Sequence, residues 1–556
     1  MLCPPSFRQG TLMHESGQQD PATFMHLKEF QSTLPDARPL AQLLEHAAKE
    51  FEGLEYVSFK DRSFSYAESW ALVRAIASGL KSSKIMQGDR VGICLSNTPH
   101  YSLACFALWR IGAAGVGMNP LYSLRQLKMI AEDSQLQWII VSDEEMQLSK
   151  ARQVAEEVGA RLIICRADAK DLIEFEPAAT RGSEVAFAEL CLETSDEELM
   201  PPPLDSVAMI QYTGGTTGTP KGAMLSHRNI WAGAHQILYW LHRIQDDSAI
   251  WYAAAPFSHI TGLLNYIVQP TIVGGKALLT ERFSAKELID LVRKRRVSVL
   301  ILIPTMLSAV LAEEKDVKEV DWSNILHVLV GGAPLSHELA RRFHEATGLW
   351  PQQGYAMTET SGSGVGMPSK KLPGHEAATG IPMRGTCVEI RSLDDPAIEV
   401  LPGEDGEICF RGANVIQSYW RRPFTSDDMT PDGFFRSGDI GSLTKDGVLY
   451  LVDRLKDVII CSGYNVYPRI IEDAVLEHPS VHETVAIGIP DNYRGETVLS
   501  VITLKAGTDI SQGELLDFLK SKLSPFEMPK RVEILDSLPK TENAKLSRKA
   551  IRDMFT

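Results

Sequence analysis

A run of glycines, hydroxyl residues and one lysine between Tyr212 and Gly222 constrains this 556-residue chain more than any other feature. The segment before it, Ser206–Tyr212, is short and apolar and predicts a buried strand that delivers the run to the edge of a sheet. Glycine lets backbone N–H groups close on phosphate oxygens, while threonine and lysine side chains add donors and a charge. The run therefore predicts a loop that grips a polyphosphate, formed by Thr213, Gly214, Gly215, Thr216, Thr217, Gly218, Thr219 and Lys221.

Two other interpretations of this run fit the sequence less well. A flexible surface turn explains the composition, but not the single lysine followed by an apolar strand and the polar Ser226–Asn229. A Walker-type loop requires Gly-Lys followed by serine or threonine, whereas this chain has Pro220–Gly222. Lys276 also follows a glycine, but Ala277 replaces the hydroxyl residue there. The sequence therefore disfavours a P-loop ATPase.

The overall composition narrows the class of protein. With 44% apolar and 23% charged residues the chain is typical of a globular protein, and its length suggests about three or four domain-sized units. The net charge of −15 argues against nucleic-acid binding and against general attraction to anionic membranes, because both need clustered lysine and arginine. No window reaches the roughly 18 apolar residues of a membrane helix, so we expect membrane contact to be peripheral at most. The oligomeric state stays open.

Cysteine usage and the amino terminus indicate the cellular compartment. Eight cysteines lie scattered along the chain, without a CxxC pair and without a histidine at metal-binding spacing. We interpret them as reduced thiols. The segment Met1–Asp20 is polar and lacks the apolar core of a signal peptide. Together these features predict a cytoplasmic protein.

Helical and strand patterns alternate from about residue 65 to 350, which predicts parallel sheets covered by helices on both faces. In one unit, Ser284–Glu287 has the pattern of a capping box and Val297–Ile303 reads as a buried strand. The basic run Arg293–Arg296 falls in the last turn of the intervening helix, where cations favour the helix dipole, so we interpret it as structural.

A second unit of the same kind follows. It comprises a helix near 305–314, a strand at Ile325–Val330, a turn at Gly331–Pro334 and a helix that ends at Gly348. The turn comes at the carboxyl end of its strand, where open α/β sheets place ligands.

The carboxy-terminal third has a different texture. After about residue 385, short strands separated by turn signals such as Asp405-Gly406 predict a β-rich subdomain over about 385–452. Beyond Asp453 the pattern predicts a compact α+β domain. Its elements are a helix that starts at Pro468, strands near 483–489 and 497–504, and a capped helix from Ser511 to Lys522.

Six separated motifs together resemble the superfamily of adenylate-forming enzymes, which includes acyl- and aryl-CoA synthetases, luciferases and the adenylation domains of peptide synthetases. The motifs are Tyr212–Gly222, Pro256–His259 with Gly262, Gly354–Glu359, Ser437–Asp439, Asp453–Asp457 and Pro539–Lys545. The resemblance extends over about residues 40–550. One departure is Ala544, where the family usually has glycine, and a left-handed backbone there would strain alanine.

The resemblance implies an organisation into domains. We expect a large N-terminal domain of doubly wound, mostly parallel α/β sheets with the β-rich subdomain, followed by a small mobile α+β domain. The boundaries we expect are an extension over 1–40, the large domain over 41–452 and the small domain over 453–556, with a hinge near 453–457.

The resemblance also implies a first reaction, in which a carboxylate attacks the α-phosphate of ATP and expels pyrophosphate. The catalytic residues it implies are Lys545, Lys221, Thr358, Glu359 and His259, with Mg²⁺ bound by Glu359 and Thr213. Asp439 would accept both ribose hydroxyls beside Arg454, and Tyr355 would offer a stacking face to the adenine. The adenine slot would consist of Gly332, Ala333, Pro334, Gly354, Tyr355, Ala356 and Met357.

A second reaction follows from the same resemblance, in which the thiol of coenzyme A attacks the acyl-adenylate. Lys545 must then leave so that the thiol can enter. The family rotates its small domain about a hinge, which matches Lys456 in this chain, and Ser462, Gly463 and Tyr464 would then line a tunnel for the pantetheine arm.

Each of four residues also has a plain structural interpretation. Asp439 could be a turn residue, and Arg454 could form an ordinary interdomain ion pair. Lys545 could belong to a solvated basic tail. His259 could be a core histidine that makes its hydrogen bonds within the protein, rather than a gate between the acid and the phosphates.

The acid is expected to bind between His259–Gln269, Gly331–Ala333 and Ala356–Gly366. No acidic residue falls within 256–270, which disfavours an amino-acid substrate because its ammonium group would need a carboxylate. We predict a medium- or long-chain fatty acid, with an aryl or cinnamate-type acid as the alternative. An acyl-AMP ligase that loads a carrier protein, a luciferase-like monooxygenase and a non-catalytic binding protein stay open as other classes.

Overall fold

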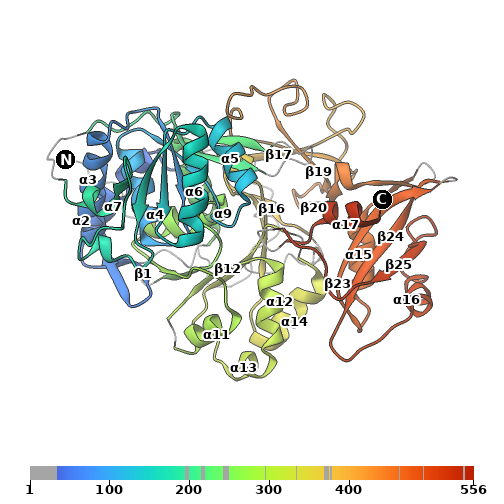
Figure 1. Ribbon diagram of the computed structural model, residues 1–556. Helices are drawn as coiled ribbons and strands as arrows, with labels where there is room; N and C mark the ends of the chain where they lie inside the picture. The colour runs from blue at the N-terminus through green and yellow to red at the C-terminus, as the bar shows by residue number, and fades with distance from the viewer. Residues whose placement is uncertain are drawn as a thin grey trace, which may run out of the picture.

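The computed structural model describes residues 34–193, 199–213, 220–241, 249–294, 296–333, 335–367, 375, 378–461, 464–491, 494–541 and 545–555. These residues form four sheets. Figure 1 shows two helix-covered sheets in the amino-terminal part and a separate carboxy-terminal body, coloured orange to red, at one side. Within the described part of the chain, none of the helices combines the length and the apolar character needed to span a bilayer.

The first large sheet has seven strands in the order β7-β6-β5-β3-β4-β8-β9, all parallel except β9. Its strands are β3 (Arg90–Cys94), β4 (Ala114–Gly117), β5 (Trp138–Ser142), β6 (Arg161–Cys165), β7 (Val185–Ala186), β8 (Val207–Thr213) and β9 (Lys221–Ser226). The helices of this region are α3 (Tyr66–Ser82), α4 (Pro99–Arg110), α5 (Leu124–Asp133), α6 (Glu145–Val158), η3 (Lys170–Leu172), α7 (Phe187–Cys191) and α8 (His227–Trp240). The antiparallel β9 forms the edge next to the predicted phosphate loop.

The second large sheet has nine strands in the order β16-β15-β14-β13-β12-β10-β11-β1-β2, parallel in the middle and antiparallel at both ends. Its strands are β1 (Glu55–Phe59), β2 (Arg62–Ser65), β10 (Ile250–Ala253), β11 (Lys276–Leu279), β12 (Val299–Leu302), β13 (His327–Val330), β14 (Gln352–Ala356), β15 (Gly364–Gly366) and β16 (Ile381–Pro382). The helices that accompany it are η2 (Leu40–Gln42), α2 (Leu43–Glu50), α9 (Ile260–Gly262), the π-helical η4 (Leu263–Val268), α10 (Gln269–Val273), α11 (Ala285–Arg293), α12 (Pro304–Ala312), α13 (Glu314–Glu319), α14 (His337–Thr347) and η5 (Thr358–Thr360).

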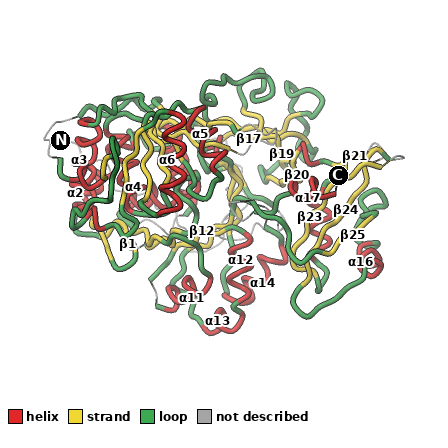
Figure 2. The backbone as a smooth tube through the Cα atoms, in the orientation of Figure 1, coloured by secondary structure: helices red, strands yellow, loops and turns green. Residues whose placement is uncertain are grey.

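Two smaller sheets complete the fold, and the yellow strands of Figure 2 show both on the carboxy-terminal side. The first is a fully antiparallel sheet of β17 (Thr386–Arg391), β18 (Gly406–Gly412), β19 (Phe435–Leu443) and β20 (Leu449–Arg454). After η6 (Leu455–Asp457), the last sheet contains β21 (Ile459–Cys461), β22 (Tyr464–Val466), β23 (Val481–Asp491), β24 (Gly495–Leu504) and β25 (Arg531–Ile534), with α15 (Pro468–Leu476), α16 (Gln512–Leu519) and α17 (Arg548–Phe555) packed against it.

The predicted α/β class with parallel sheets and a separate carboxy-terminal body is confirmed. The domain boundaries at 40, 385, 452 and 453 stay predictions. Gly348 ends α14 in the left-handed conformation as its position predicts, with φ of 76°. The predicted helix near 305–314 is broken at Glu313 into α12 and α13.

The capping box predicted at Ser284 is only half formed. The Ser284 side chain accepts a hydrogen bond from Glu287 N at 3.3 Å, as expected. The Glu287 carboxylate does not return the bond; it accepts instead from Tyr252 and Thr280, each at 3.2 Å. Tyr252 OH in turn accepts the Ser284 N–H, so a tertiary contact replaces the local one.

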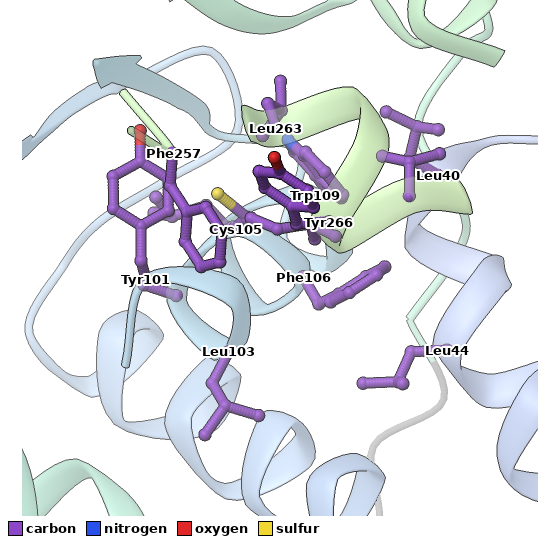
Figure 3. Packing of buried hydrophobic residues seen from close by; sticks show 14 of the residues in the cluster. Leu40, Leu44, Tyr101, Leu103, Cys105, Phe106, Trp109, Phe257, Leu263 and Tyr266 are labelled. Carbon is purple, nitrogen blue, oxygen red and sulfur yellow. The ribbon is translucent and has the colours of Figure 1, made fainter. Parts of the chain in front are cut away.

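A buried aromatic cluster fixes the segment around His259. Figure 3 shows α4 side chains packed against Phe257, Leu263 and Tyr266. Tyr101 meets Phe257 with ring centroids 5.6 Å apart, in an edge-on arrangement that aromatic pairs prefer. The two ends of the turn that carries His259 are therefore anchored in the core.

Candidate active site

The arms of the predicted phosphate loop form a hairpin at the edge of the seven-stranded sheet. β8 ends at Thr213 and β9 begins at Lys221, and these residues are partners in the antiparallel register. The loop between them, Gly214, Gly215, Thr216, Thr217, Gly218 and Thr219, lies outside the described residues. The hairpin thus brings the predicted hydroxyl and ammonium groups to one end.

Glu359 lies beside Thr213, the residue predicted to share its metal. The short helix η5 follows β14 and carries both Thr358 and Glu359. Thr213 Oγ1 and Glu359 Oε1 are 3.5 Å apart. Burial raises the pKa of the Glu359 carboxyl, and hydrogen bonds, one of them from Tyr419, oppose that rise. Carboxylate and hydroxyl oxygens are ligands that Mg²⁺ prefers, so this donor set fits the ion.

A pocket between the two domains contains most of the residues predicted for the nucleotide. Its lining comprises Gly332, Ala333, Gln353, Gly354, Tyr355, Ala356, Met357, Asp439, Leu451, Asp453, Arg454, Arg469 and Arg548. Pro334 lies outside the described residues. Segments far apart in the sequence therefore meet at the predicted adenine slot.

Asp439 faces this pocket from β19 rather than from a turn. Its Oδ2 accepts a hydrogen bond from Tyr355 OH at 2.7 Å, and its Oδ1 lies 3.2 Å from Arg454 Nε. Burial raises the pKa of the Asp439 carboxyl, whereas the Arg454 charge lowers it. Arg454 is the cross-strand partner of Asp439, so the sheet register places this ion pair.

Lys545 reaches from the carboxy-terminal body to the large domain. A Cβ built on Gly332 would lie 3.4 Å from Lys545 Nζ, so the ammonium group lies directly against this glycine. Thr541 closes the loop below it, since Lys545 O accepts from Thr541 N at 2.7 Å and Thr541 Oγ1 accepts from Lys545 N at 3.2 Å. Burial, and then the Arg454 charge, lowers the pKa of Lys545. Lys545 therefore does not belong to a solvated tail.

His259 lies on a turn that only glycine can close. A Cβ on Gly262 would come within 2.2 Å of Pro256 O, so the backbone approaches too closely for any other residue there. Burial, with a smaller contribution from Lys545, lowers the pKa of His259 to about 4. The imidazole is therefore neutral near pH 7. It lies close enough to Lys545 for the lysine charge to lower its pKa.

The predicted wall of the acid site divides into two parts. Ile260 and Leu264 are the closest side chains to Gly362, at 3.0 and 3.3 Å from its ideal Cβ, so two of the predicted segments meet there. Tyr266 instead donates its hydroxyl to Ile301 O at 3.0 Å and belongs to the core.

The predicted hinge and tunnel residues lie at the start of the small domain. Lys456 is an exposed residue of η6, and partial desolvation lowers its pKa. Ser462 and Gly463 lie outside the described residues. Tyr464 is 56% exposed and stacked on Phe526, with ring centroids 4.6 Å apart. Among the described residues it is not part of the nucleotide pocket.

Sequence reasoning missed a group of side chains that brace the phosphate hairpin. Tyr212 OH donates to Asp133 Oδ2 at 2.5 Å, and Trp420 Nε1 donates to Asp133 O at 3.0 Å. Lys221 Nζ lies 3.5 Å from Asp428 Oδ1. The one signal that could have found this group is the aromatic and basic run Tyr419–Arg422.

Comparisons with known proteins cover nearly the whole chain. A family model described as AMP-binding enzyme matches residues 44–420, and a second, described as AMP-binding enzyme C-terminal domain, matches residues 470–545. The chain is 30% identical over 558 residues to a long-chain-fatty-acid–CoA ligase of Bacillus subtilis strain 168, covering 95% of this chain and 98% of the relative. It is 32% identical over 494 residues to a feruloyl-CoA synthase of an Amycolatopsis species, covering 89% and 94%.

Solved structures share the fold over the same extent. ATP-bound MatB from Rhodopseudomonas palustris matches with a TM-score of 0.83 at 26% identity, covering 93% of this chain and 99% of that one. Apo MatB from the same organism, with the same coverage and identity, gives a TM-score of 0.75. The arrangement of the chain is thus more similar to the ATP-bound form than to the apo form.

Proposed function

Because the chain belongs to the AMP-binding enzyme family, we propose that it activates a carboxylic acid with ATP to an acyl-adenylate and transfers the acyl group to coenzyme A. The products are acyl-CoA, AMP and pyrophosphate, which makes the chain an acid–thiol ligase. The observation that carries this proposal is the position of Lys545, a small-domain lysine that lies against Gly332 at the wall of the nucleotide pocket.

In the first step two anions must meet, and negative charge spreads over the phosphoryl oxygens in the transition state. Lys545 bridges the attacking carboxylate and the α-phosphate, and Lys221 supplies a second fixed cation at the phosphate hairpin. Glu359 and Thr213 would hold Mg²⁺, which would neutralise charge on the phosphate oxygens. Thr358 contacts the nucleotide phosphate. Catalysis then comes from positioning and from preorganised charge.

The nucleoside is held by side chains whose positions are fixed by hydrogen bonds and ion pairs within the protein. Asp439 accepts the ribose hydroxyls, since each carboxylate oxygen keeps a lone pair free beside its bond to Tyr355 or Arg454. The adenine is assigned to the slot of Gly332, Ala333, Gly354, Tyr355, Ala356 and Met357, which line the pocket.

In the second step the small domain rotates about Lys456 and withdraws Lys545. Ser462, Gly463 and Tyr464 then turn towards the site and guide the pantetheine arm of coenzyme A. The exposure of Tyr464 supports this, because a residue that waits for a later ligand contact has to be accessible in the first state. Rotation of this kind follows the general logic of domain closure.

The acid is a medium- or long-chain fatty acid. Ile260 and Leu264 beside Gly362 form an apolar wall without a carboxylate, which suits an alkyl chain. An aryl acid is the second candidate, because the feruloyl-CoA synthase relative is as similar to this chain as the fatty-acid relative. We place the reaction in the cytoplasm, since every cysteine that the structure describes is a free thiol.

Pyrophosphate release measured across a panel of alkyl and aryl carboxylates, with and without coenzyme A, tests the proposal. We expect release with fatty acids and accumulation of acyl-CoA only when coenzyme A is present. Product formation with a carrier protein but not with coenzyme A would identify an acyl-AMP ligase instead. Oxygen consumption with light emission would identify a luciferase-like enzyme.

A further inference from the structure

Tyr419 stands between two residues that the proposed mechanism uses. Its hydroxyl donates to Glu359 Oε1 at 3.0 Å, the same oxygen that faces Thr213. Lys221 Nζ lies 5.0 Å from the centroid of its ring, within the range of a cation–π contact. Tyr419 is 4% exposed, so its hydroxyl is shielded from solvent.

Asp428 holds the lysine on its other side. Its Oδ1 lies 3.5 Å from Lys221 Nζ, and Arg422 Nη2 lies 2.9 Å from its Oδ2. Thr425 donates to the same Oδ2 from its backbone N at 3.1 Å and from its hydroxyl at 2.9 Å, which fixes the carboxylate. Asp428 is 4% exposed, so the two cations Lys221 and Arg422 share one buried carboxylate.

The backbone of this segment is paired with the phosphate hairpin. Trp420 N donates to Gly222 O at 2.7 Å, and Tyr419 forms an isolated antiparallel bridge with Ala223. The segment therefore covers the edge of β9 that is not paired with β8. Backbone hydrogen bonds thus fix the position of this segment relative to Lys221, in addition to the ion pair between Lys221 and Asp428.

We infer that Tyr419 and Asp428 are positioning residues that set where Glu359 and Lys221 stand relative to each other at the triphosphate. The inference rests on the proposed function. Each residue acts through a different partner: Tyr419 orients Glu359 through one hydrogen bond, and Asp428 limits the conformations of the long Lys221 side chain. Such restraint matters because a charge that is fixed before the reaction needs no reorganisation in the transition state.

The two roles give separable signatures in Tyr419→Phe and Asp428→Asn. Y419F keeps the ring and removes only the donor, so the Mg²⁺ concentration for half-maximal pyrophosphate release should rise about fivefold while KM for the acid stays constant. D428N frees Lys221 without removing it, so kcat for pyrophosphate release should fall about fivefold while KM for ATP does not rise.

Matched controls are available in the same chain. Tyr66→Phe removes a buried hydroxyl that donates to Pro270 O and Gly275 O, away from the site. Asp432→Asn removes a carboxylate of the same loop that pairs with Arg391. Both should leave the Mg²⁺ dependence and kcat unchanged.

Calorimetric titration of ATP at several Mg²⁺ concentrations separates this inference from the proposed function, because it needs no acid and no turnover. In the Glu359→Gln background, Y419F should have no further effect on Mg²⁺ dependence, as expected if it acts through Glu359. Wild-type-like Mg²⁺ dependence in folded Y419F, or a kcat in D428N that is unchanged or increased, would overturn the inference. If Y419F lacks a cooperative unfolding transition, the D428N arm decides alone.

Discussion

On the large-domain side of the nucleotide pocket, Tyr355, Asp439 and Glu359 are buried, and each is joined by a hydrogen bond to another buried side chain. On the small-domain side, Lys545 is held by its own loop through Thr541 and touches the large domain at Gly332. Among the residues that the structure describes, no carboxylate forms an ion pair with Lys545. Under the proposed function, the contrast means that the buried groups which hold the nucleotide are fixed within the large domain, whereas Lys545 is brought to them by docking of the small domain.

The sharpest test of this contrast is Lys545→Ala. We expect adenylate formation to slow by about a hundredfold or more, because a preorganised charge at the transition state is lost. Thioester formation from a supplied acyl-adenylate should stay within about twofold of wild type, since Lys545 is withdrawn in that step. Rapid-quench assays of the two half-reactions measure both. Lys549→Ala, at an exposed position of α17, is the control, and an equal loss in both half-reactions would break the comparison.

The opposite pattern is expected for Lys456→Pro at the proposed hinge. Proline fixes φ and restricts the change in backbone conformation that rotation needs. Thioester formation should slow about tenfold, while adenylation in the present arrangement is preserved. Stopped-flow detection of pyrophosphate release, followed by acyl-CoA formation, separates the steps. Slower pyrophosphate release with unchanged thioester formation would place the pivot elsewhere.

On the fixed side, Asp439→Asn should raise KM for ATP about tenfold, because a charged acceptor of the ribose hydroxyls is lost. Tyr355→Phe removes one supporting hydrogen bond and should cost less, about fivefold. KM for the acid should remain unchanged in both variants. Steady-state kinetics with each substrate varied in turn check this, and an effect confined to the acid would remove Asp439 from the nucleotide site.

A further prediction concerns stability in acid rather than activity. Burial lowers the pKa of His227, His235 and His259 to about 4, all of them in the large domain. Between the ordinary value of 6.5 and about 4 the unfolded chain therefore binds more protons, so the free energy of unfolding falls as pH drops through this window.

His235→Gln isolates one such contribution away from the proposed site. The difference in unfolding free energy between wild type and variant should change with pH between 6.5 and 4 and be constant above that range. Urea unfolding at a series of pH values measures it. A pH-independent difference would mean that His235 is not held neutral.

Local motifs predicted the arms of the phosphate hairpin well, because a strand, a glycine-rich run and a second strand fold within a few residues of one another. The proximity of Thr213 to Glu359 was implied only by resemblance, since these residues are far apart in the sequence. The hydrogen bond from Tyr355 to Asp439 was not predicted. Whether they play the roles that the resemblance implies stays a prediction.

Contacts that depend on tertiary packing could not be predicted from the sequence. Tyr419 and Asp428 meet Glu359 and Lys221 only when the antiparallel subdomain is packed on the edge of β9. In the same way, Glu287 accepts a hydrogen bond from Tyr252 instead of completing the capping box with Ser284. A local pattern carries no information about such competing partners.

The account depends on two arrangements of the small domain, and a distance between the domains tests that most directly. Spin labels at two exposed positions, Glu345→Cys on α14 and Lys520→Cys at the end of α16, report this distance by double electron–electron resonance. With ATP we expect one distance, that of the arrangement described above, and with AMP and coenzyme A a clearly different second one. A single unchanged distance under all conditions would contradict delivery and withdrawal of Lys545.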